Sequence, residues 1–499
     1  MHTSDKRQQM RDSNHSSFSG GLMTSPLFVH ADATPAVITS DGQCVTYQML
    51  RHDIAQAAAL LQPRSLLFIV GHNDYTVVRW YLAALEYGHV VMLLPADLAD
   101  SQLHNLLQLY QPRYLLAPPS RSMQLPPQFQ PCPLDWHDEG APYQSWQNQQ
   151  AQPPLHPDLA FLTSTSGSTG APKLVRMSKA NLVSNANAIA TYLQLGPHER
   201  AIAHLPLSYS FGLSILNSHL AAGGSVVLTN ASLMAREFWH AVETQQVTSF
   251  SGVPYHYEML LKLRLARMKL HQIRTMTQAG GALALPLLQQ LQPICADKQI
   301  RLVVMYGQTE ASPRISYVPS ERLADKLGSI GVAIPGGQLW LRDAQGQVLQ
   351  GADVEGELMY QGDNVCLGYA QCADDLARGD DNQQLLATGD VARRDADGFY
   401  YITGRLKRFL KIFGNRISLD QVEQLLAETG VMAVCTGVDD ALTVHWQTAE
   451  TEDTSDAADS ALQQQVAAWC GVHFSAVRVR RIPQIPRLAN GKVDYQCLN

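Results

Sequence analysis

The most constraining feature of the sequence is a glycine- and hydroxyl-rich stretch between two apolar segments, Leu162-Thr-Ser-Thr-Ser-Gly-Ser-Thr-Gly-Ala-Pro-Lys-Leu-Val175. Its two glycines let backbone N–H groups come close to an anion, and its serine and threonine hydroxyls donate hydrogen bonds to phosphate oxygens. Lys173 adds a positive charge. The stretch therefore predicts a loop that wraps a polyphosphate, although a solvated Ser/Gly linker has a similar composition.

The order of residues is more specific than the composition. It excludes a Walker A loop, because Lys173 follows Gly170 by three positions and precedes Leu174 instead of a serine or threonine. Thr-Ser-Gly-Ser-Thr-Gly-x-Pro-Lys resembles the phosphate loop of the adenylate-forming (AMP-binding) superfamily, which includes acyl-CoA synthetases, nonribosomal peptide adenylation domains and luciferases. The resemblance implies that ATP is held by Thr165, Ser166, Gly167, Ser168, Thr169, Gly170 and Lys173.

A second block, Tyr306-Gly-Gln-Thr-Glu310, follows the apolar segment Leu302–Met305. The resemblance implies that Tyr306 stacks on adenine next to Gly307, that Thr309 contacts phosphate, and that Glu310 holds Mg²⁺. The chemistry agrees, because an aromatic face suits a purine and a hard cation needs a carboxylate. Taken alone, Glu310 is more simply an exposed acid at the end of a strand.

Two later blocks complete the expected nucleotide site. Asp390, in Thr388-Gly-Asp, resembles the carboxylate that accepts the ribose hydroxyls, and Arg405 resembles the cation near ribose and phosphate. Lys407 falls where the family places the hinge between its two domains. Lys492, in Pro486-Arg-Leu-Ala-Asn-Gly-Lys, resembles the catalytic lysine that bridges the substrate carboxylate and the α-phosphate. Each of these lysines, taken alone, is ordinary surface charge.

The expected acid-binding pocket comes from three other segments. Gln278-Ala-Gly-Gly-Ala282 resembles the turn that lies against nucleotide and substrate, with Gly281 and Ala282 on the nucleotide side. Amino-acid-activating members carry an aspartate after the phenylalanine that corresponds to Phe211, whereas Gly212 stands here. This difference favours an acid without an α-amino group. We expect the pocket to be lined by Tyr209, Phe211, Gly212, Tyr255 and Gly280.

The pattern of apolar and amphipathic segments predicts the fold. Residues 65–70, 75–87 and 90–94 read as strand, helix and strand, which indicates a parallel sheet covered by helices. Glycines and short strands after Gly328 indicate a β-rich part, and residues 124–154 read as a loop or connector. We predict an α/β protein: a large domain of two parallel-sheet α/β subdomains plus a β-rich subdomain (23–404), a small mobile α+β domain (405–499), and a disordered tail (1–22).

Composition excludes several classes of partner. The net charge is −7, which gives no reason to expect nucleic acid. No apolar run approaches the ~20 residues of a membrane span, and residues 1–21 lack the apolar core of a secretory signal. The 8 cysteines are scattered, without Cys-x-x-Cys, as in a reduced cytoplasmic protein. We therefore expect a cytoplasmic location.

Together the blocks imply an AMP-forming ligase that uses ATP and Mg²⁺. It would convert a carboxylic acid into an acyl-adenylate with release of pyrophosphate, and then transfer the acyl group to the thiol of coenzyme A or of a carrier protein's phosphopantetheine. One alternative is an amino-acid-adenylating enzyme that loads a separate carrier protein. An alternative of another class is a non-catalytic nucleotide sensor, against which the joint presence of Lys173, Glu310, Asp390, Arg405 and Lys492 argues.

Overall fold

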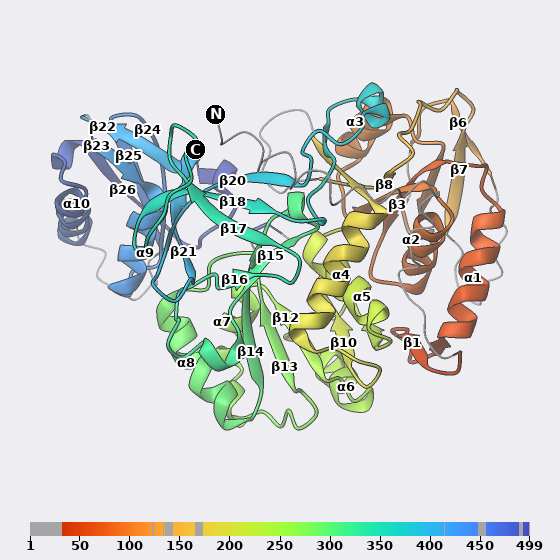
Figure 1. Cartoon of the computed structure of the whole chain (residues 1–499), viewed down its shortest axis with the longest axis horizontal. Coiled ribbons are helices and arrows are strands. Elements are labelled where there is room, and N and C mark those ends of the chain that lie inside the picture. The colour runs from red at the N-terminus through yellow and green to blue at the C-terminus, as the bar shows by residue number, and fades with distance from the viewer. Residues whose placement is uncertain are drawn as a thin grey trace, which may run out of the picture.

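The computed structural model describes residues 32–121, 124–132, 134, 143–164, 173–413, 415–447, 456–488 and 493–498 (Figure 1). The predicted tail, the loop residues Thr165–Gly170 and Lys492 lie outside these ranges, as does the side chain of Lys407. Among the described helices, none combines the length and apolar character that crossing a bilayer requires.

Within the described residues, the first sheet has eight strands in the order β19-β9-β8-β4-β3-β5-β7-β6, and β8, β4, β3 and β5 run parallel. Alternate residues of β3 point to opposite faces: Leu67 and Ile69 enter a core with α1 and α2, and Leu66 and Phe68 enter one with α3. The bounds are β3 (Leu66–Gly71), β4 (Val90–Pro95), β5 (Tyr114–Ala117), β6 (Phe129–Pro131), β7 (Gln144–Asn148), β8 (Leu159–Ser164), β9 (Leu174–Ser178), β19 (Gly368–Ala370), α1 (Tyr47–Ala59), α2 (Tyr75–Glu86) and α3 (Asp100–Tyr110).

The second sheet has nine strands among the described residues, in the order β16-β15-β14-β13-β12-β10-β11-β1-β2. Its strands from β14 to β1 run parallel, and α6, α7 and α8 share a core with one face. The bounds are β1 (Pro35–Ile38), β2 (Cys44–Thr46), β10 (Arg200–Ala203), β11 (Ser225–Leu228), β12 (Ser249–Gly252), β13 (Thr275–Gln278), β14 (Arg301–Gly307), β15 (Arg314–Tyr317), β16 (Val332–Ala333), α4 (Lys179–Leu193), α5 (Ser210–Ala221), α6 (Arg236–Thr244), α7 (Pro254–Lys262) and α8 (Leu285–Asp297).

The remaining elements form an antiparallel sheet and a separate C-terminal core, which is blue in Figure 1. The sheet consists of β17 (Gln338–Arg342), β18 (Glu355–Gln361), β20 (Leu385–Arg394) and β21 (Tyr400–Arg405). The C-terminal part consists of β22 (Phe409–Ile412), β23 (Asn415–Ser418), α9 (Leu419–Glu428), β24 (Ala433–Val438), β25 (Ala441–Gln447), α10 (Asp456–Cys470) and β26 (Val477–Ile482).

The predicted fold class is confirmed, with two α/β sheets, a β-rich part and a small α+β part. The prediction of a connector over residues 124–154 was wrong, because this segment contains β6 and β7. Strand β7 pairs antiparallel with β5 and places Trp146 opposite Leu115. Edge pairing to an existing sheet overrides the weak strand propensity of this Gln- and Pro-rich segment, and local sequence does not reveal such pairing.

Candidate active site

The candidate site lies where parallel strands of the nine-stranded sheet reach their carboxyl ends. Strands β10, β12, β13 and β14 end at neighbouring positions, and each leads into a segment that holds predicted site residues. In open α/β sheets, ligands bind in the crevice outside this edge. The edge therefore brings together the segments of Tyr209, Tyr255, Gly280 and Tyr306, which are far apart in the sequence.

Asp390 is the centre of the best-defined polar group in this region. It is 2% exposed. Its Oδ1 pairs with Arg405 Nε at 2.9 Å, and its Oδ2 accepts hydrogen bonds from the Tyr306 hydroxyl and from Gln308 Nε2, the latter at 3.0 Å. Burial and the Asp390 carboxylate raise the pKa of Tyr306, so its hydroxyl stays protonated and donates. The structure thus places three predicted residues, Tyr306, Asp390 and Arg405, in direct contact.

Gln308 was not among the predicted residues, although it is the central residue of the Tyr-Gly-Gln-Thr-Glu block. Besides Asp390, its amide donates to the carbonyl of Thr388 at 2.9 Å. It thereby ties the end of β14 to β20.

Thr309 and Glu310 follow in a short 3₁₀ helix, η2 (Thr309–Ala311). The Thr309 hydroxyl lies 3.4 Å from that of Ser210, at the start of α5. Oε1 of Glu310 accepts a 2.6 Å hydrogen bond from the Tyr369 hydroxyl. Burial, with Glu310 adding to it, raises the pKa of Tyr369. Tyr369 pairs with Val175 in the register of β19 and β9, so this partner of Glu310 lies on the strand beside β9, which the exposed Lys173 directly precedes.

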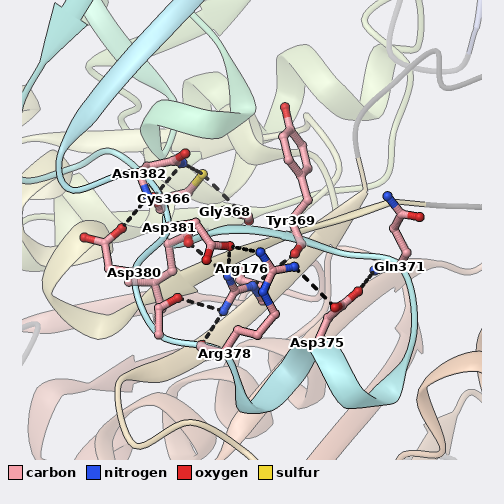
Figure 2. Close-up of polar contacts among 12 residues, drawn as sticks. Arg176, Cys366, Gly368, Tyr369, Gln371, Asp375, Arg378, Asp380, Asp381 and Asn382 are labelled. Atoms are coloured by element: carbon pink, nitrogen blue, oxygen red, sulfur yellow. Dashed lines mark hydrogen bonds and ion pairs between the residues drawn. The ribbon is translucent and has the colours of Figure 1, made fainter.

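Arg176, a buried arginine that was not predicted from the sequence, connects β9 to the segment that carries Tyr369 (Figure 2). Arg176 of β9 is 0% exposed, and its guanidinium pairs with Asp381 at 2.6 Å. It also donates to the carbonyls of Leu367 at 3.0 Å and Tyr369 at 3.2 Å. In Figure 2 the Tyr369 ring points away from this cluster while its carbonyl faces it. Arg176 therefore anchors the strand after the glycine-rich loop to the strand that carries Tyr369.

The predicted acid pocket residues fall into two groups. Tyr209 and Gly280 are in close contact: Gly280 has φ +84°, and a Cβ there would lie 2.6 Å from the Tyr209 hydroxyl oxygen, so only glycine fits. Tyr255 is exposed at the start of α7. Phe211, in contrast, is 2% exposed and packs within the core, and a Cβ at Gly212 would lie 2.3 Å from the carbonyl oxygen of Pro206.

Arg314, which was also not predicted, lies against this pocket region. It is 3% exposed, and its guanidinium carbon is 4.2 Å from the centre of the Phe211 ring. Nothing in the local sequence marks it, except that it follows the Tyr306–Glu310 block closely.

The segment that leads to Lys492 touches the large domain near this pocket. Arg487 and Val493 form an antiparallel bridge on either side of residues 489–492. The Arg487 guanidinium lies 3.5 Å from Glu258 Oε1 and 6.0 Å from the Tyr255 ring centre. Both partners belong to α7.

The described residues contain no cluster of three or more His, Cys, Asp or Glu side chains that would hold a metal ion without other ligands. Glu310, with Oε1 bonded to Tyr369, offers a single carboxylate at the end of β14. This donor set fits a Mg²⁺ ion that takes most of its ligands from phosphate oxygens and water.

A family profile described as AMP-binding enzyme matches residues 29–370. A sulfoacetate–CoA ligase of Cupriavidus necator is 28% identical over 448 residues, which span 87% of this chain and 80% of that protein. An L-proline–[L-prolyl-carrier protein] ligase of Pseudomonas fluorescens is 30% identical over 355 residues, 68% of this chain and 67% of that protein.

Among solved structures, the o-succinylbenzoate CoA synthetase of Bacillus subtilis, in complex with its acyl-adenylate intermediate, superposes with a TM-score of 0.73. The match covers 92% of this chain and 94% of that one at 24% identity, and it supports the fold.

Proposed function

The chain belongs to the AMP-binding enzyme family and is an AMP-forming acid–thiol ligase, and we propose that its substrate is a carboxylic acid without an α-amino group. The acid is activated with ATP and passed to a thiol, either of coenzyme A or of a separate carrier protein. The observation that carries the activation of the acid with ATP is the convergence of Tyr306 and Arg405 on Asp390, beside Thr309 and Glu310.

In the first half-reaction, a carboxylate oxygen of the acid attacks the α-phosphorus of ATP, and the bond to pyrophosphate breaks. In the second, the thiol sulfur attacks the acyl carbon, the bond to AMP breaks, and the thiol proton passes to water. Neither step needs a strong base on the protein. Its contribution is to position the reactants and to neutralise the charge that develops on phosphate oxygens.

The residues divide this work. Asp390 accepts the ribose hydroxyls, and Arg405 supplies positive charge beside it, because the two are already paired at 2.9 Å. Thr309 and Lys173, with the loop residues 165–170, hold the phosphates. When Mg²⁺ is bound, it offsets phosphate charge, and Glu310 holds it together with phosphate oxygens. Lys492 bridges the substrate carboxylate and the α-phosphate.

The backbone at Gly212 supports an acid without an α-amino group. An aspartate at this position would serve as a counterion for a substrate ammonium. However, even a Cβ at Gly212 would collide with the Pro206 carbonyl oxygen, at 2.3 Å. A carboxylate therefore cannot stand here without movement of the backbone. The lack of room for a side chain at Gly212 therefore favours fatty, aryl or other amine-free acids over amino acids.

Exchange of labelled pyrophosphate into ATP tests the proposal, with fatty, aryl and amino acids supplied one at a time. We expect exchange that depends on an amine-free acid and that falls at least about a hundredfold in Lys492→Ala, because this lysine would neutralise charge on the α-phosphate of the transferred adenylyl group. Exchange only with amino acids would support the carrier-protein loading enzyme. ATP binding without exchange for any acid would support the nucleotide sensor.

A further inference from the structure

Arg314 is a buried arginine whose charge has no counterion among the described residues. It opens β15 opposite Gly307, at the strand end that leads to Thr309 and Glu310. Its Nη2 donates to the Ser214 hydroxyl at 3.3 Å, while Nε is buried and has no hydrogen-bond partner among the residues described. No carboxylate of the described chain lies within ion-pair distance of it.

Two other arginines of the described chain show how a buried or half-buried guanidinium is paired with carboxylates. Arg176 faces Asp381 at 2.6 Å, and Arg408 contacts Asp420 at 2.8 Å and Glu423 at 2.6 Å. The partners of Arg314 are instead neutral: the hydroxyls of Ser214 and Tyr192, and the face of Phe211. Burial lowers the pKa of Arg314, yet a guanidinium remains protonated at neutral pH. A buried, unpaired charge is strongly unfavourable for folding, so its presence needs a separate explanation.

The surroundings of Arg314 add positive potential instead of offsetting it. Phe211 and Ser214 lie in the first turns of α5, a helix of 12 residues whose N-cap, Tyr209, makes no side-chain capping hydrogen bond. The N-terminal end of a helix carries a partial positive charge. The guanidinium and this helix end therefore favour an anion at the same place, next to the Tyr209–Gly280 contact of the predicted acid pocket.

We propose that Arg314 binds a second anionic group of the acid substrate, which makes the substrate a dianionic acid. One carboxylate is activated at the α-phosphate, and the other anionic group pairs with the guanidinium. A carboxylate can accept two parallel hydrogen bonds from Nε and an Nη of an arginine, and Nε is the atom without a partner here. This inference rests on the proposed function and defines its substrate class more narrowly.

The test compares acids that differ only in the second group: butyrate, succinate, 3-sulfopropanoate and 3-phosphonopropanoate, with benzoate and isophthalate as an aryl pair. We expect wild-type pyrophosphate exchange to prefer the dianionic member of a pair. In Arg314→Met, the ratio of dianionic to monoanionic exchange should fall between about tenfold and about a hundredfold, as for loss of a charged hydrogen bond. The sulfonate and phosphonate arms identify which anion the site prefers.

A second measurement separates substrate binding from a structural role. Methionine has a volume close to that of arginine and carries no charge, so Arg314→Met should raise the melting temperature of the ligand-free protein. The dianionic acid should stabilise wild type and have no such effect on the variant. Arg342→Met, which removes an arginine paired with Glu357 at 2.7 Å, is the matched control. It should not raise the melting temperature of the ligand-free protein, and the dianionic acid should still stabilise it as it stabilises wild type.

Three outcomes would overturn the inference. The first is a wild-type preference for monoanionic acids, which leaves the proposed function intact. The second is that Arg314→Met leaves the ratio of exchange with dianionic to monoanionic acids unchanged and melts at a lower temperature than wild type. The third is the absence of exchange with every acid, which would contradict the proposed function as well.

Discussion

The Tyr369 hydroxyl donates a 2.6 Å hydrogen bond to Oε1 of Glu310, the residue expected to hold Mg²⁺. The backbone on both sides is fixed, because the amide of Cys366 donates to the Glu310 carbonyl at 2.8 Å and Arg176 holds the Tyr369 carbonyl. This bond orients the carboxylate and leaves Oε2 for the ion.

Tyr369→Phe should therefore weaken metal binding more than ATP binding. Loss of such an outer partner typically costs 10–100-fold in metal affinity. Because Tyr369 is 41% exposed, we expect the loss of metal affinity to be near the lower end of this range, about tenfold. The measurement is an Mn²⁺ titration by electron paramagnetic resonance in the presence of ATP. Tyr401→Phe, which removes a hydroxyl 3.3 Å from Asp395, should leave the titration unchanged.

Asp390→Asn should weaken ATP binding, because an amide replaces a buried carboxylate that accepts three donors. The substitution also leaves Arg405 without its counterion. We expect kcat/KM for ATP to fall about a hundredfold, mostly through KM, since the ribose contact is made before and during the reaction. Steady-state exchange at varied ATP checks this. Asp353→Asn, at an exposed ion pair with Arg393, should stay within about twofold of wild type.

The contact between Arg487 and Glu258 should favour the arrangement in which the C-terminal domain lies over the acid pocket. The pair is half-buried at 3.5 Å, so its contribution is small, about 1 kcal/mol or less. Arg487→Met and Glu258→Gln should each slow adenylation by up to about fivefold, and the double variant should be no slower than either single one. Additive losses in the double-mutant cycle would show that the two side chains act independently.

Two histidines near the end of β10 should make stability depend on pH. Burial, followed by the neighbouring His256, lowers the pKa of His204 to about 3, and burial lowers the pKa of His256 to about 4. The unfolded chain takes up these protons near pH 6.5, whereas the folded protein does not. Above pH 6.5 both histidines are neutral in the folded and the unfolded protein, so the free energy of unfolding has its full value. As the pH falls from 6.5 towards 4, only the unfolded chain takes up these protons, and the free energy of unfolding decreases.

Urea unfolding between pH 7 and pH 4.5 measures this effect. Each histidine should lower the free energy of unfolding by about 1.4 kcal/mol for each pH unit below 6.5. His204→Phe should reduce the slope of the free energy of unfolding against pH. The reason is that phenylalanine keeps the stacking on Phe250 and carries no titratable group. The exposed His240→Gln is the control. A slope unaffected by His204→Phe would contradict the assignment.

Much of the fold could be predicted from sequence, because period-two apolar strands and amphipathic helices have local signatures. The predicted strand over 65–70 and helix over 75–87 correspond to β3 and α2 within one residue at each end. Strands β6 and β7 were missed because they exist through pairing with β5, a contact that their own composition does not favour.

By itself, the sequence determined the family and predicted which residue types serve the nucleotide site, because ordered blocks such as Tyr306–Glu310 and Thr388–Asp390 carry this information locally. It could not indicate Arg176, Arg314 or Tyr369, nor the partners of Gln308 within the Tyr306–Glu310 block. Their roles depend on which distant side chain each one meets, and on whether a buried charge finds a counterion. Only the tertiary structure decided that Arg176 is paired with Asp381 while Arg314 faces an aromatic ring, because burial and pairing arise when distant segments pack together.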